Sequence, residues 1–216
     1  MTADVTLYTN PQSRGRIARW MLEETGVAYT TVVLDYGTTM VAEAYRAINP
    51  MMKVPAIVHG DQVVTETAAI CAYLAEAFPD AELAPLPDER AAYYRWLFFA
   101  AGPLEAAITN RAFGVTVTEE QQRMAGYGDF DRAVGVIGDA VARTPYIAGD
   151  RFTAADVYVG SQLMWFTQFG LVPKTDAIMA YIGRLADRPA HRRATALDDG
   201  KVEDGAKVEE GGAAGD

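Results

Sequence analysis

Residues 54–78 have the sequence VPAIVHGDQVVTETAAICAYLAEAF, and this stretch decides the fold of the first part of the chain. The apolar run 54–58 begins next to a proline, and the turn sequence HGDQ separates it from the short run 63–65. This pattern predicts two strands that pair antiparallel through a hairpin. Over 67–78, large apolar side chains recur every four residues, which indicates a helix. The stretch therefore predicts a strand–strand–helix unit.

The residues before this unit predict a strand–helix–strand pattern. Apolar and polar side chains alternate up to Leu7, and the turn sequence NPQS follows at 10–13. An apolar stripe then runs to Gly26, where a helix can end, and alternation resumes over 27–33. A right-handed crossover makes these two strands parallel. With a short helical pattern that ends near Ile48, the N-terminal part of the chain is predicted to be an α/β domain.

Prolines separate this α/β domain from a helical one. Pro79, Pro85 and Pro87 interrupt any helix, so a linker is predicted between the two domains. Beyond the linker the pattern is helical throughout, which predicts an all-α bundle. The end of the chain is rich in Gly, Ala and acidic residues, and it has too few apolar groups to offset the entropy of ordering. The expected parts are the α/β domain 1–79, the linker 80–88, the helical domain 89–196 and a solvated tail 197–216.

The composition excludes several classes of protein. The 216 residues carry a formal net charge of −10, which argues against a general surface for nucleic acid or for an anionic membrane. A single cysteine, Cys71, excludes an internal disulfide framework, and with two histidines the usual zinc spacings are missing, so we expect no metal. No leader or membrane-spanning run is expected, since a span needs about 18 apolar residues. We expect a soluble, cytoplasmic protein.

Three stretches of the sequence resemble the cytosolic glutathione transferases of the bacterial type. They are residues 7–16 (LYTNPQSRGR), 49–57 (NPMMKVPAI) and 65–70 (TETAAI). The last two are specific as a pair, because they stand on the two sides of the predicted hairpin. The resemblance implies a thioredoxin-like N-terminal domain with a mixed four-stranded sheet, followed by an all-helical C-terminal domain. It also implies a homodimer whose co-substrate is glutathione and whose second substrate is a small hydrophobic electrophile.

A site for glutathione needs groups that bind two carboxylates and backbone that pairs with its peptide bonds. Thr67 begins the predicted helix, where free N–H groups and the helix dipole attract anions, although a threonine there can equally be an ordinary cap. The resemblance implies that Glu66 and Thr67 hold the γ-glutamyl end of glutathione. It implies a cis peptide at Val54-Pro55, with the Val54 backbone binding the cysteinyl part. Lys53 would reach the glycyl carboxylate, unless it is merely a solvated loop lysine.

The reactive end of this site is expected in the loop 10–13. Thioredoxin-like folds carry a Cys-Pro-x-Cys motif there, whereas this chain has NPQS, so the loop has no thiol for disulfide exchange. A hydroxyl or amide donor at a helix start suits another task, which is to stabilise a bound thiolate. Lowering a thiol pKa of about 8.5 by two units needs about 2.7 kcal/mol. One hydrogen bond to the sulfur and a helix terminus can supply that together.

Four residues are candidates for this donor. Ser13 comes first because it opens the predicted helix and matches the serine-type members of the family, although a serine there is also a common helix cap. Asn10 comes second. Tyr8 and Thr9 are alternatives if the alignment with the family is shifted by a few residues, and Tyr8 then matches the tyrosine-type members.

Several other residues are expected to serve mainly structure. Cys71 lies on the apolar face of its helix and is expected to be inert core. Thr153 and Asp156 have the spacing of a capping box. Arg14 and Arg16 could add positive potential near glutathione. Arg16 could equally be a structural partner of the second domain. The aromatic residues expected mostly in the core or in a dimer interface, with a few lining an apolar pocket, are Tyr93, Tyr94, Trp96, Phe98, Phe99, Trp165, Phe166 and Phe169.

The sequence predicts one function and leaves two alternatives open. The predicted function is that of a glutathione transferase that directs the thiolate at an electrophile. The first alternative is a non-catalytic member of the fold that binds glutathione or another protein. The second alternative is a glutathione-dependent isomerase, dehalogenase or peroxidase on the same scaffold. The first domain does not distinguish between these functions, because the second domain selects the electrophile.

Overall fold

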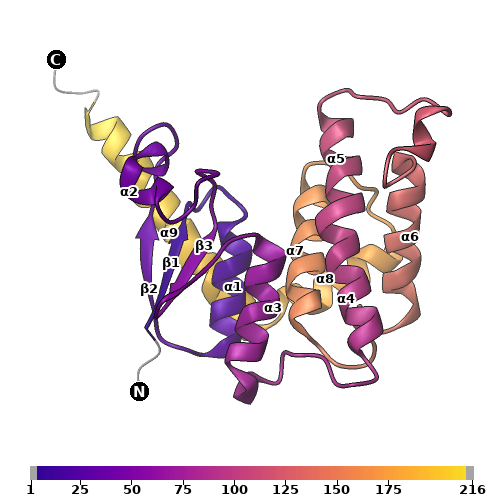
Figure 1. The fold of residues 1–216 in the computed structure, drawn as a ribbon, viewed down its shortest axis with the longest axis horizontal. Coiled ribbons are helices and arrows are strands. Elements are labelled where there is room, and N and C mark those ends of the chain that lie inside the picture. The colour runs from indigo at the N-terminus through magenta and orange to yellow at the C-terminus, as the bar shows by residue number, and fades with distance from the viewer. Residues whose placement is uncertain (1–3, 213–216) are drawn as a thin grey trace. The chain divides into compact units, whose positions relative to one another are not determined.

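The computed structural model describes residues 4–212, with side chains up to Val202. The chain divides into two compact units, which are described separately here. A sheet unit comprises Met1–Ala81 together with Arg188–Asp216, and a helical unit comprises Glu82–Asp187. Figure 1 shows the strands in the first unit and the long helices of the second. The expected α/β domain followed by an all-helical domain is therefore confirmed.

The sheet unit contains a mixed four-stranded sheet with strand order β2-β1-β3-β4. Its strands are β1 (Val5–Thr9), β2 (Tyr29–Val33), β3 (Ala56–His59) and β4 (Gln62–Val64). β1 pairs parallel with β2 and antiparallel with β3, which pairs antiparallel with β4. Gly60 takes a positive φ of 57° in the tight turn between β3 and β4, a conformation that glycine adopts without strain. This topology is the thioredoxin-like arrangement that the resemblance implies.

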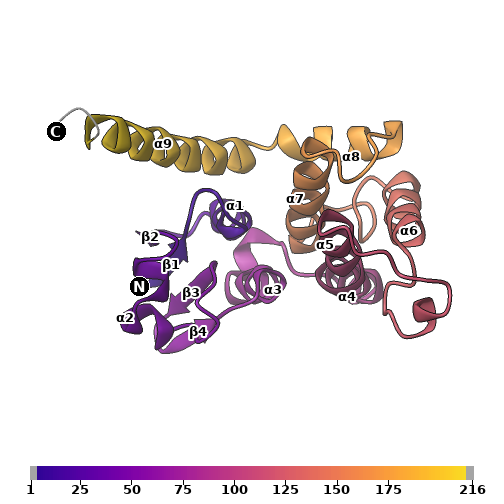
Figure 2. The same cartoon turned by 90° about the horizontal axis from the view of Figure 1, so that it is seen from above.

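Helices cover the sheet. They are α1 (Gly15–Thr25), η1 (Thr39–Val41), α2 (Glu43–Arg46), α3 (Thr67–Ala77), η2 (Pro79–Ala81) and α9 (Pro189–Gly212). Figure 2 shows α1 and α3 beside the sheet and α9 running past α1, and both α3 and α9 contact α1. Leu7 and Ile57 face each other across β1 and β3 and are fully buried. Tyr8 and Ala56 are the next pair, so they point to the opposite face, where they pack with Tyr45 of α2.

The helical unit is a bundle. Its helices are α4 (Arg90–Phe99), η3 (Ala100–Leu104), α5 (Glu105–Ala112), η4 (Gln121–Arg123), α6 (Phe130–Arg143), α7 (Ala154–Gln168) and α8 (Asp176–Ala186). Figure 1 shows α5, α6 and α7 running alongside one another. η3 is a π-helical turn that contains Pro103, and a proline lacks the N–H of a regular α-helical bond. Within the described residues, no helix has the length and apolarity needed to cross a membrane.

The predicted capping box at the start of α7 is confirmed. The Asp156 carboxylate accepts hydrogen bonds from the backbone N–H of Thr153 at 2.9 Å and from its hydroxyl at 3.1 Å. The same carboxylate also accepts the N–H of Ile147 at 2.7 Å and the hydroxyl of Tyr181 at 2.9 Å. Asp156 is completely buried, so this carboxylate joins α7 to the preceding loop and to α8.

The end of the chain differs from expectation. A solvated tail was expected from residue 197 and a helical domain up to 196, whereas α9 runs without a break over Pro189–Gly212 and belongs to the sheet unit. Ala194 and Asp198 are buried. The reason is that the charged residues of α9 meet opposite charges on α1, and this tertiary pairing outweighs a local composition that favours disorder. The last four residues of the expected tail, 213–216, lie outside the described part.

Candidate functional site

Asn10 fixes the loop that precedes α1. Its Nδ2 donates to the carbonyl of Leu34 at 2.8 Å, and its Oδ1 accepts the N–H of Gln12 at 2.9 Å. Only 7% of Asn10 is exposed. The amide therefore ties the loop to the residue that follows β2, and both ends of the side chain are engaged.

Ser13 lies at the other end of the same loop, where α1 begins. Its Oγ accepts the N–H of Gly15 at 2.9 Å and donates its proton to the carbonyl of Asn10 at 2.6 Å. The residue is 8% exposed. Because a hydroxyl has one proton, rotation about the Cβ–Oγ bond away from Asn10 is what frees it for another acceptor.

Thr9 lies beneath this loop and is fully buried. Among the described residues its Oγ1 has no hydrogen-bond partner. It packs so closely against Gly15 that a methyl group at that position would overlap Oγ1 of Thr9 and lie 3.0 Å from Oγ of Ser13. Gly15 is a site residue that sequence reasoning missed, and the signal that could have found it is a glycine inside the first turn of a helix.

Tyr8 lies on the opposite face of the sheet from Thr9 and is half-buried. Its ring packs against Tyr45 with centroids 5.6 Å apart. The Tyr45 hydroxyl donates to the carbonyl of Lys53 at 2.6 Å, and Nδ2 of Asn49 donates to the same carbonyl at 2.7 Å. Burial raises the pKa of Tyr45, which keeps this hydroxyl protonated as a donor.

The segment at residues 53–55 carries three of the expected binding residues. The Val54-Pro55 peptide is cis, as expected. The Lys53 side chain is exposed, while its carbonyl is held by the two bonds described above. Pairing of β3 with β1 begins at Ala56, so Val54 lies just before the sheet ladder. Val54 and Tyr8 pack against the same buried cluster, which brings the two segments together.

The start of α3 has the geometry of an anion site. Glu66 is exposed and takes a φ of 64°, a left-handed conformation that is rare for a residue with a side chain. It makes no side-chain cap, and the first helical bond is donated by Ile70 to the Glu66 carbonyl at 2.9 Å. The amides of residues 67–69 precede that bond and have no acceptor within the helix, so they and the helix dipole favour an anion at this N-terminus. Thr67 is mostly buried there.

Cys71, one turn further along α3, does not take part in this chemistry. The side chain is fully buried, and burial raises the pKa of the thiol. A protonated, buried thiol is a poor nucleophile. The expectation that Cys71 is part of the core is confirmed.

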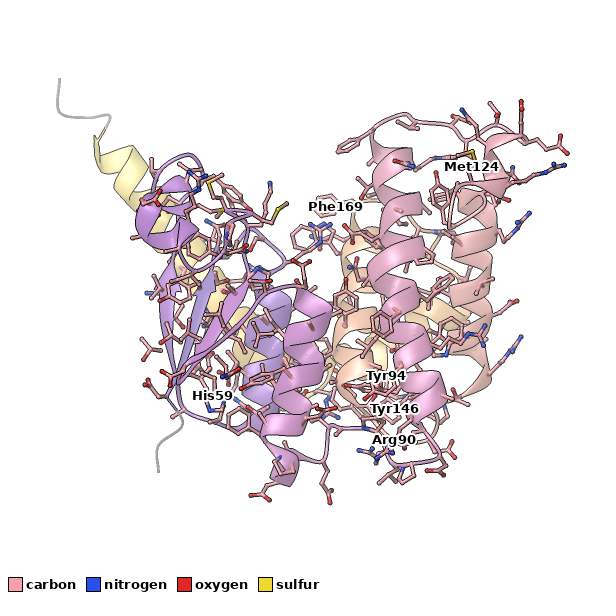
Figure 3. The ribbon with its side chains drawn as sticks, in the orientation of Figure 1. His59, Arg90, Tyr94, Met124, Tyr146 and Phe169 are labelled. Atoms are coloured by element: carbon pink, nitrogen blue, oxygen red, sulfur yellow. The ribbon has the colours of Figure 1, made fainter. Side chains whose placement is uncertain are left out.

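His59, at the end of β3, contacts the Tyr73 hydroxyl through Nδ1 at 3.0 Å and is labelled in Figure 3.

Most of the expected aromatic residues of the helical unit fall into two groups. The buried ones are Tyr93, Trp96 and Phe166, and those with exposed side chains are Tyr94, Phe98, Trp165 and Phe169. Phe99 belongs to neither group, since it is half-buried. Figure 3 shows Tyr94 near the same end of the unit as Tyr146, with Met124 at the opposite end. The first group forms core, and the second group remains available to line a binding surface.

A cavity of about 300 Å³ lies in the helical unit where α5 ends and α6 begins. Arg111, Asp129 and Asp131 contribute to its lining. The Arg111 guanidinium lies over the ring of Phe130, 4.8 Å from its centroid. These charges do not match the apolar pocket expected for an electrophile, so we do not place the second substrate there.

Comparison with known proteins identifies the class that this fold and site define. The N-terminal domain of the glutathione S-transferase family matches residues 7–82, and its C-terminal domain matches residues 80–193. The two matches together span most of the chain. The chain therefore belongs to the glutathione S-transferase family.

Individual relatives agree with this assignment. The glutathione S-transferase GstA of Escherichia coli O157:H7 is 29% identical over 189 residues, which are 85% of this chain and 93% of the relative. A theta class glutathione S-transferase from Xanthomonas axonopodis pv. citri, solved with glutathione bound, is 29% identical with a TM-score of 0.69 and covers 89% of this chain and 97% of its own. A stringent starvation protein A homolog of Pasteurella multocida is 26% identical over 173 residues, which are 79% of each chain.

Proposed function

We propose that this chain binds glutathione along β3 and the start of α3, holds its sulfur as a thiolate at the loop 10–13, and directs it at an electrophile. The observation that carries the proposal is the positive φ of Glu66, just before α3, in the same unit as the loop 10–13. Strained backbone of this kind is retained where a site needs it. Family membership and a relative solved with glutathione support the same reading.

The binding roles follow from the chemistry of glutathione, which has two carboxylates, one ammonium and a thiol. The amides at the start of α3 and the Thr67 hydroxyl would bind the γ-glutamyl carboxylate, and the exposed Glu66 carboxylate would pair with the ammonium. The Val54 backbone, which precedes the β3 ladder, would pair with the cysteinyl residue. Lys53, whose side chain is exposed, would bind the glycyl carboxylate.

Ser13 is the proposed donor to the thiolate. Its hydroxyl accepts the N–H of Gly15 at the start of α1, so the helix terminus adds to the positive potential around it. Rotation about the Cβ–Oγ bond would redirect its hydrogen bond from the Asn10 carbonyl to the sulfur. Asn10 is a weaker candidate because both ends of its amide hold the loop. Thr9 is buried below the loop, which leaves Tyr8 as the main rival.

The first experiment measures glutathione binding by thermal melts and calorimetry. At free glutathione 100 times the Kd, binding should stabilise the protein by about 2.7 kcal/mol. No change in melting temperature and no heat of binding would remove the proposed function while leaving the fold unaffected.

The second experiment assigns the donor by the absorbance of bound thiolate against pH. Ser13→Ala should raise the pKa of bound glutathione and lower the rate with an aryl halide by about 100-fold, as for loss of one oxyanion-hole donor. Ser161→Ala on α7 is the matched control and should leave both unchanged. A normal profile for Ser13→Ala, with a raised pKa in Tyr8→Phe, would make Tyr8 the donor.

A non-catalytic role is the second candidate, because one relative, at 26% identity, is named a stringent starvation protein A homolog and not a transferase. A measurement of turnover distinguishes this non-catalytic role from that of a transferase. A binding module would bind glutathione with no decrease in the thiol pKa and no product from a panel of alkyl and aryl electrophiles. Turnover without conjugate would instead indicate isomerase, dehalogenase or peroxidase chemistry.

We also propose that the protein is a homodimer. Analytical ultracentrifugation, which measures the mass in solution, gives the test.

A further inference from the structure

The C-terminal helix α9 is bound to α1 by charges that run in opposite order on the two helices. Along α1, basic residues come first and acidic residues later. Along the end of the chain, basic residues come first and acidic residues last. The resulting ion pairs are Arg16–Asp199, Arg19–Asp198, Glu23–Arg193 and Glu24–Arg188. This order fixes an antiparallel register, since a shifted pairing would oppose like charges.

A buried ion pair anchors this register. Nε of Arg19 donates to Oδ1 of Asp198 at 2.8 Å, and the two side chains are 4% and 1% exposed. Nη1 of Arg19 also donates a hydrogen bond to the Tyr29 hydroxyl at 3.2 Å. That hydroxyl in turn donates to the Glu23 carboxylate at 2.8 Å. Removing either partner of a buried pair leaves an uncompensated charge, so the pair holds α9 at one position on α1.

Asp199, the next residue, connects α9 to the loop 10–13. Its Oδ1 accepts a hydrogen bond from Nη2 of Arg16 at 2.5 Å. Nε of the same guanidinium donates to the carbonyl of Pro11 at 2.6 Å. A guanidinium is a rigid planar fork, so an acceptor at one arm sets the direction of the other arm. Pro11 lies between Asn10 and Ser13, which are the two ends of the loop.

We propose that Asp199 is a positioning residue for the glutathione site, which acts through Arg16 on the Pro11 carbonyl and so holds the loop that presents Ser13. The proposal rests on the proposed function, because it assumes that this loop faces the sulfur of glutathione. It gives the C-terminal helix a role in thiol activation, although α9 contributes no proposed contact to glutathione.

The sign of one measurement separates positioning from plain electrostatics. Asp199→Asn removes a negative charge and leaves Arg16 unneutralised, so electrostatics alone would stabilise the thiolate and lower the pKa of bound glutathione. Asparagine keeps one acceptor, but its neutral bond to Arg16 is weaker than that of the carboxylate. Weaker positioning would raise the pKa, because a displaced donor stabilises the thiolate less. We expect the pKa to rise by about half a unit, which is about threefold less thiolate at a pH below it.

The control is Arg193→Gln, which breaks an ion pair between the same two helices at the end away from the loop. The two residues are matched in exposure, 56% for Asp199 and 55% for Arg193, and both pairs are of the exposed kind that adds little stability. The control should leave the thiol pKa and the glutathione Kd unchanged. A double variant, Arg16→Gln with Asp199→Asn, should show no larger pKa change than Arg16→Gln alone, because the two residues act in series.

The assay is the absorbance of bound thiolate against pH, together with glutathione affinity by calorimetry, on the full-length protein. A raised pKa in Asp199→Asn, absent in Arg193→Gln and not additive with Arg16→Gln, supports the proposal. An unchanged or lowered pKa in Asp199→Asn overturns it. If the wild-type protein binds no glutathione, the proposed function fails first, and that result is visible before any variant is made.

Discussion

The substitution Asp156→Ala tests how much of the helical unit depends on a single buried carboxylate. In the wild-type structure this side chain is fully buried and accepts hydrogen bonds from Thr153, Ile147 and Tyr181. Alanine removes the acceptor and leaves two backbone N–H groups and two hydroxyls without that partner in the core. Water has no direct access to them, so the cost exceeds that of an ordinary helix cap.

The magnitude follows from those orphaned groups. A buried donor without a partner costs about 1–3 kcal/mol, so the four donors together give a loss of about 3–5 kcal/mol if the two hydroxyls rotate and neighbouring groups relax in part. A folded domain has a total stability of about 5–15 kcal/mol. The matched control is Asp129→Ala at the start of α6, where the carboxylate accepts one N–H, from Arg132 at 2.8 Å, and is 32% exposed. That cap should cost about 0.5–2 kcal/mol.

Urea unfolding of Asp156→Ala and Asp129→Ala, compared at equal m values, measures the difference between their losses of unfolding free energy. Asp156→Asn keeps the volume and one acceptor, so it should fall between the two alanine variants and remain measurable if Asp156→Ala does not fold. The folded fraction of each variant should keep its affinity for glutathione. Equal losses for Asp156→Ala and Asp129→Ala would refute the reasoning. An unchanged stability with a collapse of glutathione affinity would place Asp156 in the binding site.

Three further predictions concern single positions. Gly15→Ala should cost about 1–3 kcal/mol in urea unfolding and weaken glutathione binding, since the new methyl group displaces the buried Thr9; equal stability would show that the loop can yield. Burial opposes ionisation of Glu89, but the Arg151 guanidinium at 2.6 Å and the N–H of Leu86 at 2.8 Å together outweigh it and lower the pKa of that carboxyl. The ionised Glu89 therefore stabilises the fold above its unfolded pKa of about 4.3, and this stabilisation is lost as pH falls through its pKa in the folded state. Glu89→Gln should accordingly be less stable than wild type at pH 7 and equally stable at about pH 2. Cys71 should react with a thiol reagent only after unfolding, because it is buried and protonated; rapid reaction in the native state would contradict that.

The parts of the fold that were predictable depend on local patterns. The hairpin and α3 follow from two short apolar runs, the turn sequence between them and a four-residue apolar repeat, all within residues 54–78. The capping box at Thr153 follows from a three-residue spacing. The roles of Asn10 and Thr9 were not predictable, because one binds Leu34 across the sheet and the other is buried under Gly15. The ranking of donors in the loop therefore depends on tertiary contacts.

The C-terminal helix shows why composition misled the interpretation of residues 197–216. Seen locally, a segment rich in Gly, Ala and acidic residues has little apolar surface with which to offset its ordering entropy. The compensating partner lies about 180 residues earlier, since Arg16 and Arg19 on α1 meet Asp199 and Asp198. A comparison of the charge order on the two helices would have predicted the pairing, basic before acidic in both segments. Asp198 and Asp199 are thus complementary to α1, and their ion pairs join α9 to the unit that carries the proposed glutathione site.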